Sequence, residues 1–500
     1  MTYPYLLNKK KIHLYASLFF VYHLNITDIN QNRVKMKKKL PNLIAMLGIA
    51  FIIISGTVDL DNLFDYENQS KPNYITKDNT PQNNAIDNKI ATLGRVLFYD
   101  KNLSANNTIA CASCHKQEKA FGDDAVQSIG LNGGLTGRHS MRLINSRFSD
   151  EQKFFWDERA VSLEDQTTKP IQDHVEMGFS GTNGDADFDD LIVKLSAIDY
   201  YEDLFKFAFG DTTISEERIQ SALSQFIRSI QSFDSKYDIG RAQVNNANDN
   251  FPNFTFEENQ GKRLFRAPPN MNGAGCAGCH RGDEFDIDPN TRNNGIINVA
   301  GSATEIDLTN FRAPTLRDLV NPDGSLNGPM MHDGSLATLI DVINHYDEVP
   351  NNAANTELDN RLKAGPNTQN LNLTNNEKLA LEAFLKTLTG VDVYTNEKWS
   401  NPFDENGNIT LTGSVLSTEK NLFGKNVSVY PNPVKDFLNV KLEKGNYSLF
   451  IYNTIGKQVF KNTVEDMETF NISNLSKGIY HLKIVDLETS KNFSKKFIKQ

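Results

Sequence analysis

Apolar residues recur at helical spacing in two stretches of the chain, one behind Thr213 and one behind Thr374. Each threonine is followed three residues later by a glutamate, Glu216 or Glu377, as in the capping box of a helix N-terminus. The apolar stripes comprise Ile219, Leu223, Phe226, Ile227 and Ile230 in the first stretch, and Leu379, Leu381, Phe384, Leu385 and Leu388 in the second. Positions three and four apart share one helix face, so the pattern predicts two amphipathic helices with a buried side.

The pattern changes from helical spacing to strict alternation at about Asn426. Turn sequences such as Pro431-Asn432-Pro433 separate short runs in which apolar and polar residues alternate. The runs are 427–430, 437–442, 447–452 and 478–484. Alternation with a period of two predicts strands with one buried face. We therefore expect a mainly α chain that ends in a small all-β sandwich at residues 426–500.

The N-terminal part carries the pattern of an export signal. Met36-Lys37-Lys38-Lys39 forms a positive region, and residues 43–54 form an apolar core of signal-peptide length. This core is too short for a transmembrane helix, and no cysteine follows it to carry a lipid. We expect residues 36–56 to be the signal peptide and residues 1–35 to be an over-called start.

All four cysteines of the chain belong to two copies of one motif, C-x-x-C-H. In such a motif the two thiols bind the vinyl groups of a porphyrin, and the histidine ligates the iron. The alternative is a pair of redox-active or zinc-binding C-x-x-C units. We expect two covalently bound haem c groups, held by Cys111, Cys114, His115, Cys276, Cys279 and His280. Haem c is attached outside the cytoplasm, in agreement with the export signal.

The sequence around each motif is duplicated. Leu93-Gly94-Arg95-Val96-Leu97-Phe98 precedes the first motif, and Gln260-Gly261-Lys262-Arg263-Leu264-Phe265 precedes the second. Two similar units with one haem each predict two cytochrome c-like domains, which we place at 89–245 and 246–392. Two polar stretches flank this pair of domains, 57–88 before the first and 393–425 after the second, and both are expected to be exposed linkers.

The segment between the motifs contains candidates for peroxide chemistry. Cleavage of peroxide at a haem iron requires an open coordination site and a neighbouring base that moves a proton between the two oxygens. Glu176, flanked by Val175 and Met177, fits this role because burial raises the pKa of a carboxyl group towards neutrality. The alternative is a surface or capping carboxylate. Trp156 is either a core residue or an electron relay between the haems.

Residues 93–390 resemble the bacterial di-haem cytochrome c peroxidases, including the branch around MauG, which oxidises a partner protein. The matching motifs include the runs 154–160, 175–178, 311–317 and 331–335. In that family the first haem reacts with peroxide, and the second transfers electrons. A tryptophan lies between the haems, and the catalytic glutamate follows it by twenty residues. The resemblance implies these roles for Trp156 and Glu176, and a distal pocket containing Gln166 and Pro170.

Two departures from the family affect the haem ligands. Residues 128–137 lack the histidine that caps the first haem in many members, so this haem is expected to stay open unless His139 takes its place. Tyr346 stands where peroxidases place a methionine ligand of the second iron, as it does in the MauG branch. The alternative is that Tyr346 packs in a helix core and that Met330 or Met331 ligates.

An interhaem calcium ion is a further implication of the resemblance. The carbonyl groups near Asn327 and Pro329 match positions that bind calcium in the family. His139 occupies the position of the usual asparagine ligand, and this departure weakens the expectation of a calcium ion beside the two haems.

The tail resembles the C-terminal sorting domain of type IX secretion substrates of the Bacteroidetes. The matching pieces are 429–433, 474–480 and 495–499. This resemblance implies that the type IX machinery moves the protein from the periplasm to the cell surface or the medium. The alternative is a binding module for carbohydrate or protein.

Together these patterns predict an exported di-haem peroxidase that reduces hydrogen peroxide with electrons from a small c-type cytochrome or cupredoxin. One alternative is a MauG-like oxidase of a protein or organic substrate, and the second is a non-catalytic electron carrier. The formal net charge of −10 argues against nucleic acid as a partner. A homodimer is a further expectation.

Overall fold

The structure is a computed structural model of the 500-residue chain. It describes residues 63–287, 289–405, 407–411, 427–442, 445–453, 457–465, 468–487 and 492–500. The expected over-called start at 1–35 and the signal peptide at 36–56 lie outside the described residues. Among the helices that are described, none is long and apolar enough to cross a membrane.

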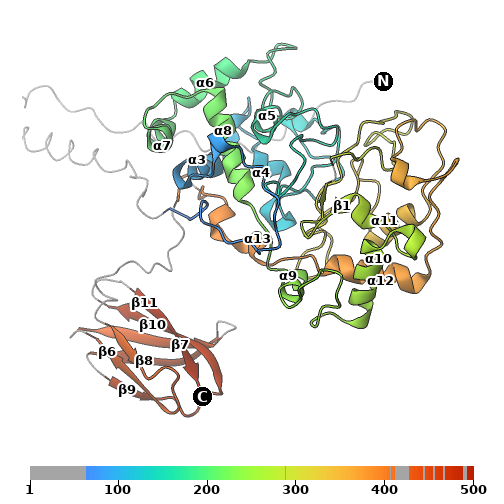
Figure 1. The fold of residues 1–500 in the computed structure, drawn as a ribbon. Coiled ribbons are helices and arrows are strands. Elements are labelled where there is room, and N and C mark those ends of the chain that lie inside the picture. The colour runs from blue at the N-terminus through green and yellow to red at the C-terminus, as the bar shows by residue number, and fades with distance from the viewer. Residues whose placement is uncertain are drawn as a thin grey trace, which may run out of the picture. The chain divides into compact units, whose positions relative to one another are not determined.

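The first half of the haem region, up to residue 245, is helical (Figure 1). Its elements are η1 (Gln82–Asn84), α3 (Asn88–Tyr99), η2 (Lys101–Leu103), α4 (Cys111–Cys114), η3 (Gln117–Lys119), η4 (Leu131–Gly133), α5 (Leu163–Thr168), α6 (Phe188–Ser196), α7 (Asp199–Phe209), α8 (Glu216–Ser229) and α9 (Lys236–Arg241). The prediction that Thr213 caps the first amphipathic helix is wrong. Ser215 is the N-cap of α8, and its hydroxyl accepts from the backbone N–H of Arg218.

The second half, from residue 246 to 411, contains α-helices, four short 3-10 turns and two short β-hairpins in its described residues. Its elements are α10 (Phe256–Arg266), η5 (Pro269–Met271), η6 (Cys276–Gly278), β1 (His280–Arg281), β2 (Asp286–Ile287), α11 (Leu339–Asp347), η7 (Asn360–Leu362), β3 (Lys363–Ala364), β4 (Asn367–Thr368), α12 (Asn375–Lys386), α13 (Asp392–Thr395) and η8 (Glu397–Trp399). The capping box predicted at Thr374 and Glu377 is confirmed at the start of α12.

Each half contains one pair of closely crossing helices, α3 with α8 and α10 with α12. The crossing point is a glycine of the duplicated motif. A Cβ atom on Gly94 would lie 1.9 Å from the carbonyl oxygen of Ala222, and one on Gly261 would lie 1.8 Å from that of Ala380. Only glycine permits this approach of two backbones. The sequence repeat therefore corresponds to a repeated packing unit beside each haem motif.

The two segments expected to be exposed linkers, 57–88 and 393–425, pack against the haem region wherever they are described. Tyr66 is fully buried, and its hydroxyl donates to the carbonyl oxygen of Lys398 at 2.6 Å. Trp399 is also buried. A few large apolar side chains anchor both segments, although their overall composition is polar. The polar composition of these segments predicted exposed linkers, because an average over many residues does not reveal a few buried aromatic side chains.

The tail consists of two antiparallel sheets. One has the order β5-β6-β9, and the other has the order β11-β10-β7-β8. The strands are β5 (Ser428–Tyr430), β6 (Phe437–Lys441), β7 (Tyr447–Asn453), β8 (Gln458–Val464), β9 (Glu468–Asn471), β10 (Gly478–Asp486) and β11 (Asn492–Lys499). Buried residues of both sheets belong to one apolar cluster, as the alternating pattern requires.

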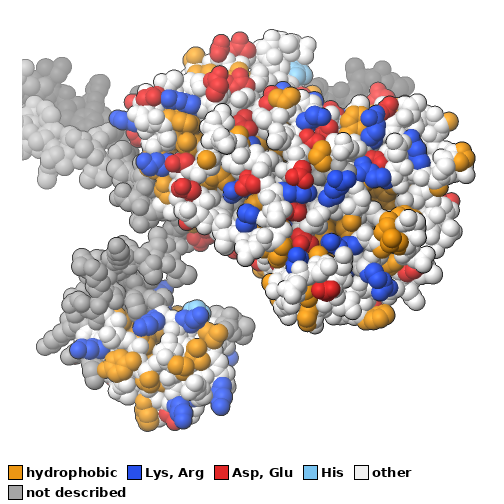
Figure 2. All heavy atoms as spheres, in the orientation of Figure 1, with side chains coloured by type: hydrophobic (Ala, Val, Ile, Leu, Met, Phe, Trp, Pro, Cys, Tyr) orange, Lys and Arg blue, Asp and Glu red, His pale blue; other side chains and the backbone are white. Residues whose placement is uncertain are grey.

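Acidic and basic side chains are interspersed over the visible face of the haem region (Figure 2). Ion pairs of the haem region include Arg147 with Asp78 at 2.6 Å and Arg292 with Glu357.

Candidate haem and peroxide site

Two cavities in the haem region each contain one C-x-x-C-H motif. The first cavity, of about 640 Å³, is lined by Cys111, Cys114 and His115. The second cavity, of about 570 Å³, is lined by the motif that begins at Cys276 and ends at His280. Both volumes are typical of ligand and cofactor sites. The four cysteines form no disulfide bond within the described residues, and each lines the cavity of its motif.

Both histidines of the motifs are neutral and turned into their cavities. The Nδ1 atom of His115 lies 3.1 Å from the carbonyl oxygen of Phe121, so Nδ1 donates and Nε2 is left as the ligand atom. The Nδ1 atom of His280 has no hydrogen-bond partner in the described structure, although the backbone of Pro314 and of Phe285 acts to raise the pKa of this imidazole. Both phenylalanines adopt positive φ angles, 59° and 53°. Burial lowers the pKa of His115, and that of His280 to about 4. The residues of each cavity thus fit a covalently attached haem.

Glu176 lies in the wall of the first cavity. Burial, reinforced by the carboxylate of Asp173, raises the pKa of Glu176 to about 7, although Arg159 opposes this rise. No cation forms an ion pair with the Glu176 carboxylate in the described part of the chain. A carboxyl group of this kind exchanges protons readily near neutral pH.

The other two predicted distal residues, Gln166 and Pro170, line the same cavity. Gln166 belongs to α5, which begins after the N-cap Ser162, and Pro170 follows the end of that helix. The structure thus brings Trp156, Gln166, Pro170 and Glu176 together around the first motif.

The loop at residues 128–137 lies against the backbone of Glu176. The backbone N–H of Leu131 donates to the carbonyl oxygens of Val175 at 2.7 Å and of Glu176 at 3.1 Å. His139 follows this loop and lines both cavities, and its Nδ1 atom lies 2.9 Å from the carbonyl oxygen of Ala125.

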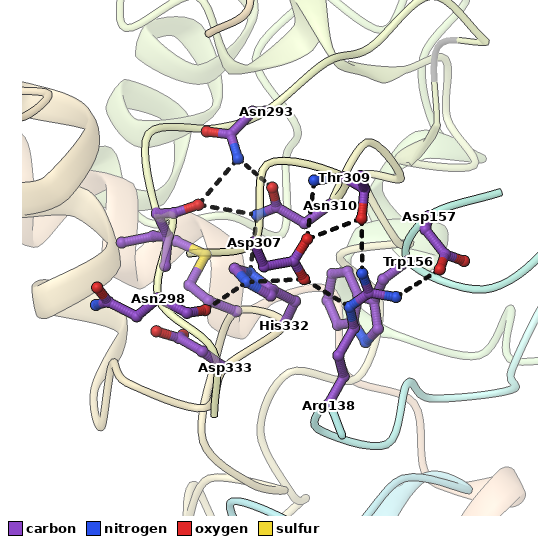
Figure 3. Close-up of polar contacts among 12 residues, drawn as sticks. Arg138, Trp156, Asp157, Asn293, Asn298, Asp307, Thr309, Asn310, His332 and Asp333 are labelled. Carbon is purple, nitrogen blue, oxygen red and sulfur yellow. Dashed lines mark hydrogen bonds and ion pairs between the residues drawn. The ribbon is translucent and has the colours of Figure 1, made fainter. Parts of the chain in front are cut away.

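Trp156 lies in the wall shared by the two cavities. Its indole N–H donates to the carbonyl oxygen of His139 at 2.8 Å. The ring of His332 stands edge-on to the indole, with 6.3 Å between the ring centroids. Figure 3 shows this junction and the polar groups around it.

All three side chains considered as ligands of the second iron line the second cavity. They are Tyr346 of α11, Met330 and Met331. Burial raises the pKa of Tyr346, so the phenol keeps its proton in the haem-free chain. The amide of Asn294 donates to the sulfur atom of Met331 at 3.2 Å.

Comparison with known proteins identifies the haem region. A model of the di-haem cytochrome c peroxidases matches residues 88–245. The methylamine utilization protein MauG of Methylophilus methylotrophus is 30% identical over 351 residues, which cover 69% of this chain and 95% of that protein. This chain belongs to the di-haem cytochrome c peroxidase family. Membership implies haem c as the cofactor.

Two other members illustrate the range of the family. The cytochrome c551 peroxidase of Nitrosomonas europaea is 29% identical over 324 residues, covering 62% of this chain and 82% of that protein. The crystal structure of a MauG-like protein associated with microbial copper homeostasis has a TM-score of 0.54 and 30% identity, covering 67% of this chain and 99% of that structure. The family thus contains both named peroxidases and MauG proteins.

The tail matches a second family. A model of the secretion system C-terminal sorting domain covers residues 428–500. A domain of this kind implies export to the cell surface or secretion.

The calcium site expected from the family stays a prediction. Pro329 lines the second cavity. The side-chain amide of Asn327 donates to the carbonyl oxygen of Asp318 at 2.7 Å and to the Tyr394 hydroxyl at 2.9 Å. Over the described ranges, no group of three or more His, Cys, Asp or Glu side chains is arranged to hold a metal ion.

Sequence reasoning missed the arginines at the junction. Arg142 and Arg312 line both cavities. Arg138 binds Asp157, 19 residues away in sequence, and Asp307, 169 residues away. No local spacing signals the contact with Asp307, because Arg138 and Asp307 come from different halves of the haem region.

Proposed function

We propose that the protein reduces hydrogen peroxide to water with electrons from a small redox protein, a c-type cytochrome or a cupredoxin. The observation that carries this proposal is Glu176. Its carboxyl group is half-buried in the wall of the first cavity, has a pKa raised to about 7 and has no ion-pair partner among the described residues. A structural carboxylate would be paired or exposed, whereas a proton-transfer group benefits from a pKa near the working pH.

The bound haem of the first cavity would supply the iron at which peroxide is cleaved and electrons are taken up. In that reaction the Glu176 carboxylate takes the proton from one peroxide oxygen and returns it to the other, which leaves as water. The amide of Gln166 can donate a hydrogen bond to a peroxide oxygen, and the Pro170 ring, which has no donor, limits access of water.

Electrons are proposed to enter at the second cavity and to cross at Trp156. The indole lines both cavities, so it offers a continuous covalent and van der Waals path through their common wall. A small redox protein that docks near the second motif can therefore supply the two electrons that the reduction of peroxide consumes.

A second candidate function is a MauG-like oxidation of a protein or organic substrate. The position of Tyr346 in the second cavity favours it. A phenolate is a harder ligand than a thioether and would stabilise the ferric state of the second haem, which opposes simple electron entry from a donor.

Stopped-flow mixing of the di-haem protein with hydrogen peroxide distinguishes these functions. The peroxidase predicts a rapid change in the haem spectrum and catalytic oxidation of an added reduced cytochrome. Spectral change without oxidation of any small donor would favour the MauG-like reaction. If the haem spectra do not respond to peroxide, both enzymatic functions are excluded, and a non-catalytic electron carrier is the remaining hypothesis.

A further inference from the structure

The turn that carries Trp156 has a strained backbone. Phe155 and Glu158, on either side of the tryptophan, have positive φ angles of 69° and 57°. Backbone angles of this kind cost of order 1–3 kcal/mol for residues other than glycine and persist only where the surroundings hold them. The groups that hold this turn therefore determine where the indole lies.

One segment of the second half, residues 307–312, supplies most of these groups. The carbonyl oxygen of Trp156 accepts the backbone N–H groups of Phe311 at 2.8 Å and of Arg312 at 3.0 Å. The guanidinium of Arg312 also donates to the carbonyl oxygen of Lys153. The backbone of the turn is thus bound to a segment about 150 residues away in sequence.

Arg138 clamps the turn to the same segment (Figure 3). Its guanidinium donates to Asp157 at 2.7 Å, to Asp307 at 2.7 Å and to the hydroxyl of Thr309 at 2.8 Å. The hydrogen bonds from Arg138 and Thr309 outweigh desolvation and lower the pKa of Asp307 to about 2. The ion pair between Arg138 and Asp307 therefore persists well below neutral pH, and the three contacts of Arg138 have the fixed geometry of a guanidinium.

The ring of His332 completes the packing around the indole. The side-chain amide of Asn293 donates to the side-chain oxygen of Asn310. This bond orients the Asn310 amide so that its N–H group donates to Nδ1 of His332 at 2.8 Å. The Nε2–H of His332 then donates to the carbonyl oxygen of Asn298 at 2.9 Å. These bonds hold the imidazole neutral and edge-on to Trp156.

We propose that Arg138, through Asp157 and Asp307, is a positioning residue that fixes the indole of Trp156 for electron transfer between the two haems. The proposal rests on the proposed function, because it requires electrons to cross at Trp156. With haem held in both cavities, the group in the second would give up one electron and the group in the first would take it up, so the transfer would balance. No proton moves, because the indole N–H is bonded to a peptide carbonyl, which is not a base.

Laser-flash reduction of the fully oxidised di-haem protein tests this role, with the redistribution of the electron between the haems followed by absorbance. Arg138→Met should slow the redistribution about tenfold or more, since displacement by about 1 Å is costly in a positioned reaction. Asp307→Asn replaces the carboxylate that binds Arg138 with a neutral amide and should also slow the redistribution. The matched control is Arg147→Met, which breaks a similar pair with Asp78 away from both cavities and should leave the rate unchanged.

A double-mutant comparison separates positioning from a general structural effect. If Arg138 acts through the indole, Arg138→Met should have no further effect in a Trp156→Phe background. A slow Trp156→Phe variant together with normal Arg138→Met and Asp307→Asn variants would overturn the positioning role alone. Equal slowing by Arg138→Met in both backgrounds would also overturn it. A Trp156→Phe variant with an unchanged rate would overturn the relay itself, and with it this part of the proposed function.

Discussion

At the scale of single residues, the environment of a carboxyl group distinguishes a candidate for proton transfer from a carboxylate with a structural role. Glu176 lines the first cavity without an ion-pair partner in the described chain, and desolvation raises its pKa to about 7. Asp238 is buried, but Arg317 binds both of its oxygens at 2.9 Å, and its pKa is lowered. Both side chains are carboxylates in an environment that excludes most water, and the arginine partner lowers the pKa of one while its absence leaves the pKa of the other raised.

The raised pKa of Glu176 predicts a pH dependence of peroxide cleavage. Only the carboxylate can accept a proton, so the rate measured by stopped flow should rise as the pH increases through about 7. Glu176→Gln should lower the rate by about 10²-fold and remove this rise. Asp173→Asn serves as the control: it should keep the rise but move it to lower pH, because the Asp173 carboxylate helps to raise the pKa. A rise that persists in Glu176→Gln would exclude Glu176 as the base.

The buried pair of Arg317 and Asp238 predicts a large effect on stability. Arg317→Met leaves the Asp238 carboxylate buried without its partner, which should lower the free energy of unfolding by about 3–5 kcal/mol. Urea unfolding of the di-haem protein at pH 7 measures this loss. Arg147→Met breaks the more exposed pair with Asp78 and should cost about 0–1 kcal/mol. Equal losses for the two variants would contradict the structural role.

The ligand of the second iron is testable by single substitutions in the second cavity. If Tyr346 ligates, Tyr346→Phe should change the absorption and resonance Raman spectra of the second haem only. Met330→Leu and Met331→Leu should then leave the spectra unchanged. The reverse result would assign the ligand to a methionine.

At the scale of elements, the repeated helix crossings determine how the haem motifs are supported. Both crossings use a glycine whose missing Cβ lets the partner backbone approach, and both use a phenylalanine of the partner helix, Phe226 or Phe384, as the next contact. The capping signals were partly readable: Thr374 begins α12 as expected, whereas Ser215 displaces Thr213 at α8.

Gly261→Ala tests the importance of the crossing. The new Cβ would lie 1.8 Å from a backbone carbonyl oxygen, so α10 and α12 must separate, and the free energy of unfolding should fall by about 3 kcal/mol or more. Glu257→Ala, at an exposed position of the same helix, should change it by no more than about 0.5 kcal/mol. Equilibrium unfolding of the di-haem protein compares the two, and similar stabilities would show that the helices do not cross this closely.

At the scale of the whole molecule, the chain combines a haem region with a β tail of a different family. The family matches, 88–245 and 428–500, lie at opposite ends of the described chain. The tail has its own apolar core, so its fold does not depend on the haem. The residues that would hold the haems and the residues that match the sorting domain therefore lie in separate parts of the chain.

A chain that ends at residue 411 tests this separation. Residues up to Leu411, which is buried, should be retained because they pack on the haem region. We expect this shortened protein to show the same haem spectra and the same rate of peroxide cleavage as the full chain, but to accumulate in the periplasm of its host. Loss of the haem spectrum on truncation would show that the two parts are interdependent.

The sequence by itself determined the features that depend on neighbouring residues. The haem motifs, the duplicated glycine motif, the amphipathic helices and the alternating tail are all written in local spacing, and local spacing follows from backbone geometry. It also placed Trp156, Gln166, Pro170 and Glu176 through a family resemblance, and these residues do line one cavity.

Only the tertiary structure decided which distant residues share an environment. The polar segment at 63–88 packs on the haem region because Tyr66 finds a site between helices that composition does not reveal. The clamp from Arg138 to Asp307 spans 169 residues. The pKa of Glu176 depends on how completely the cavity wall excludes water. Burial and long-range pairing are properties of the assembled fold, so no local pattern encodes them.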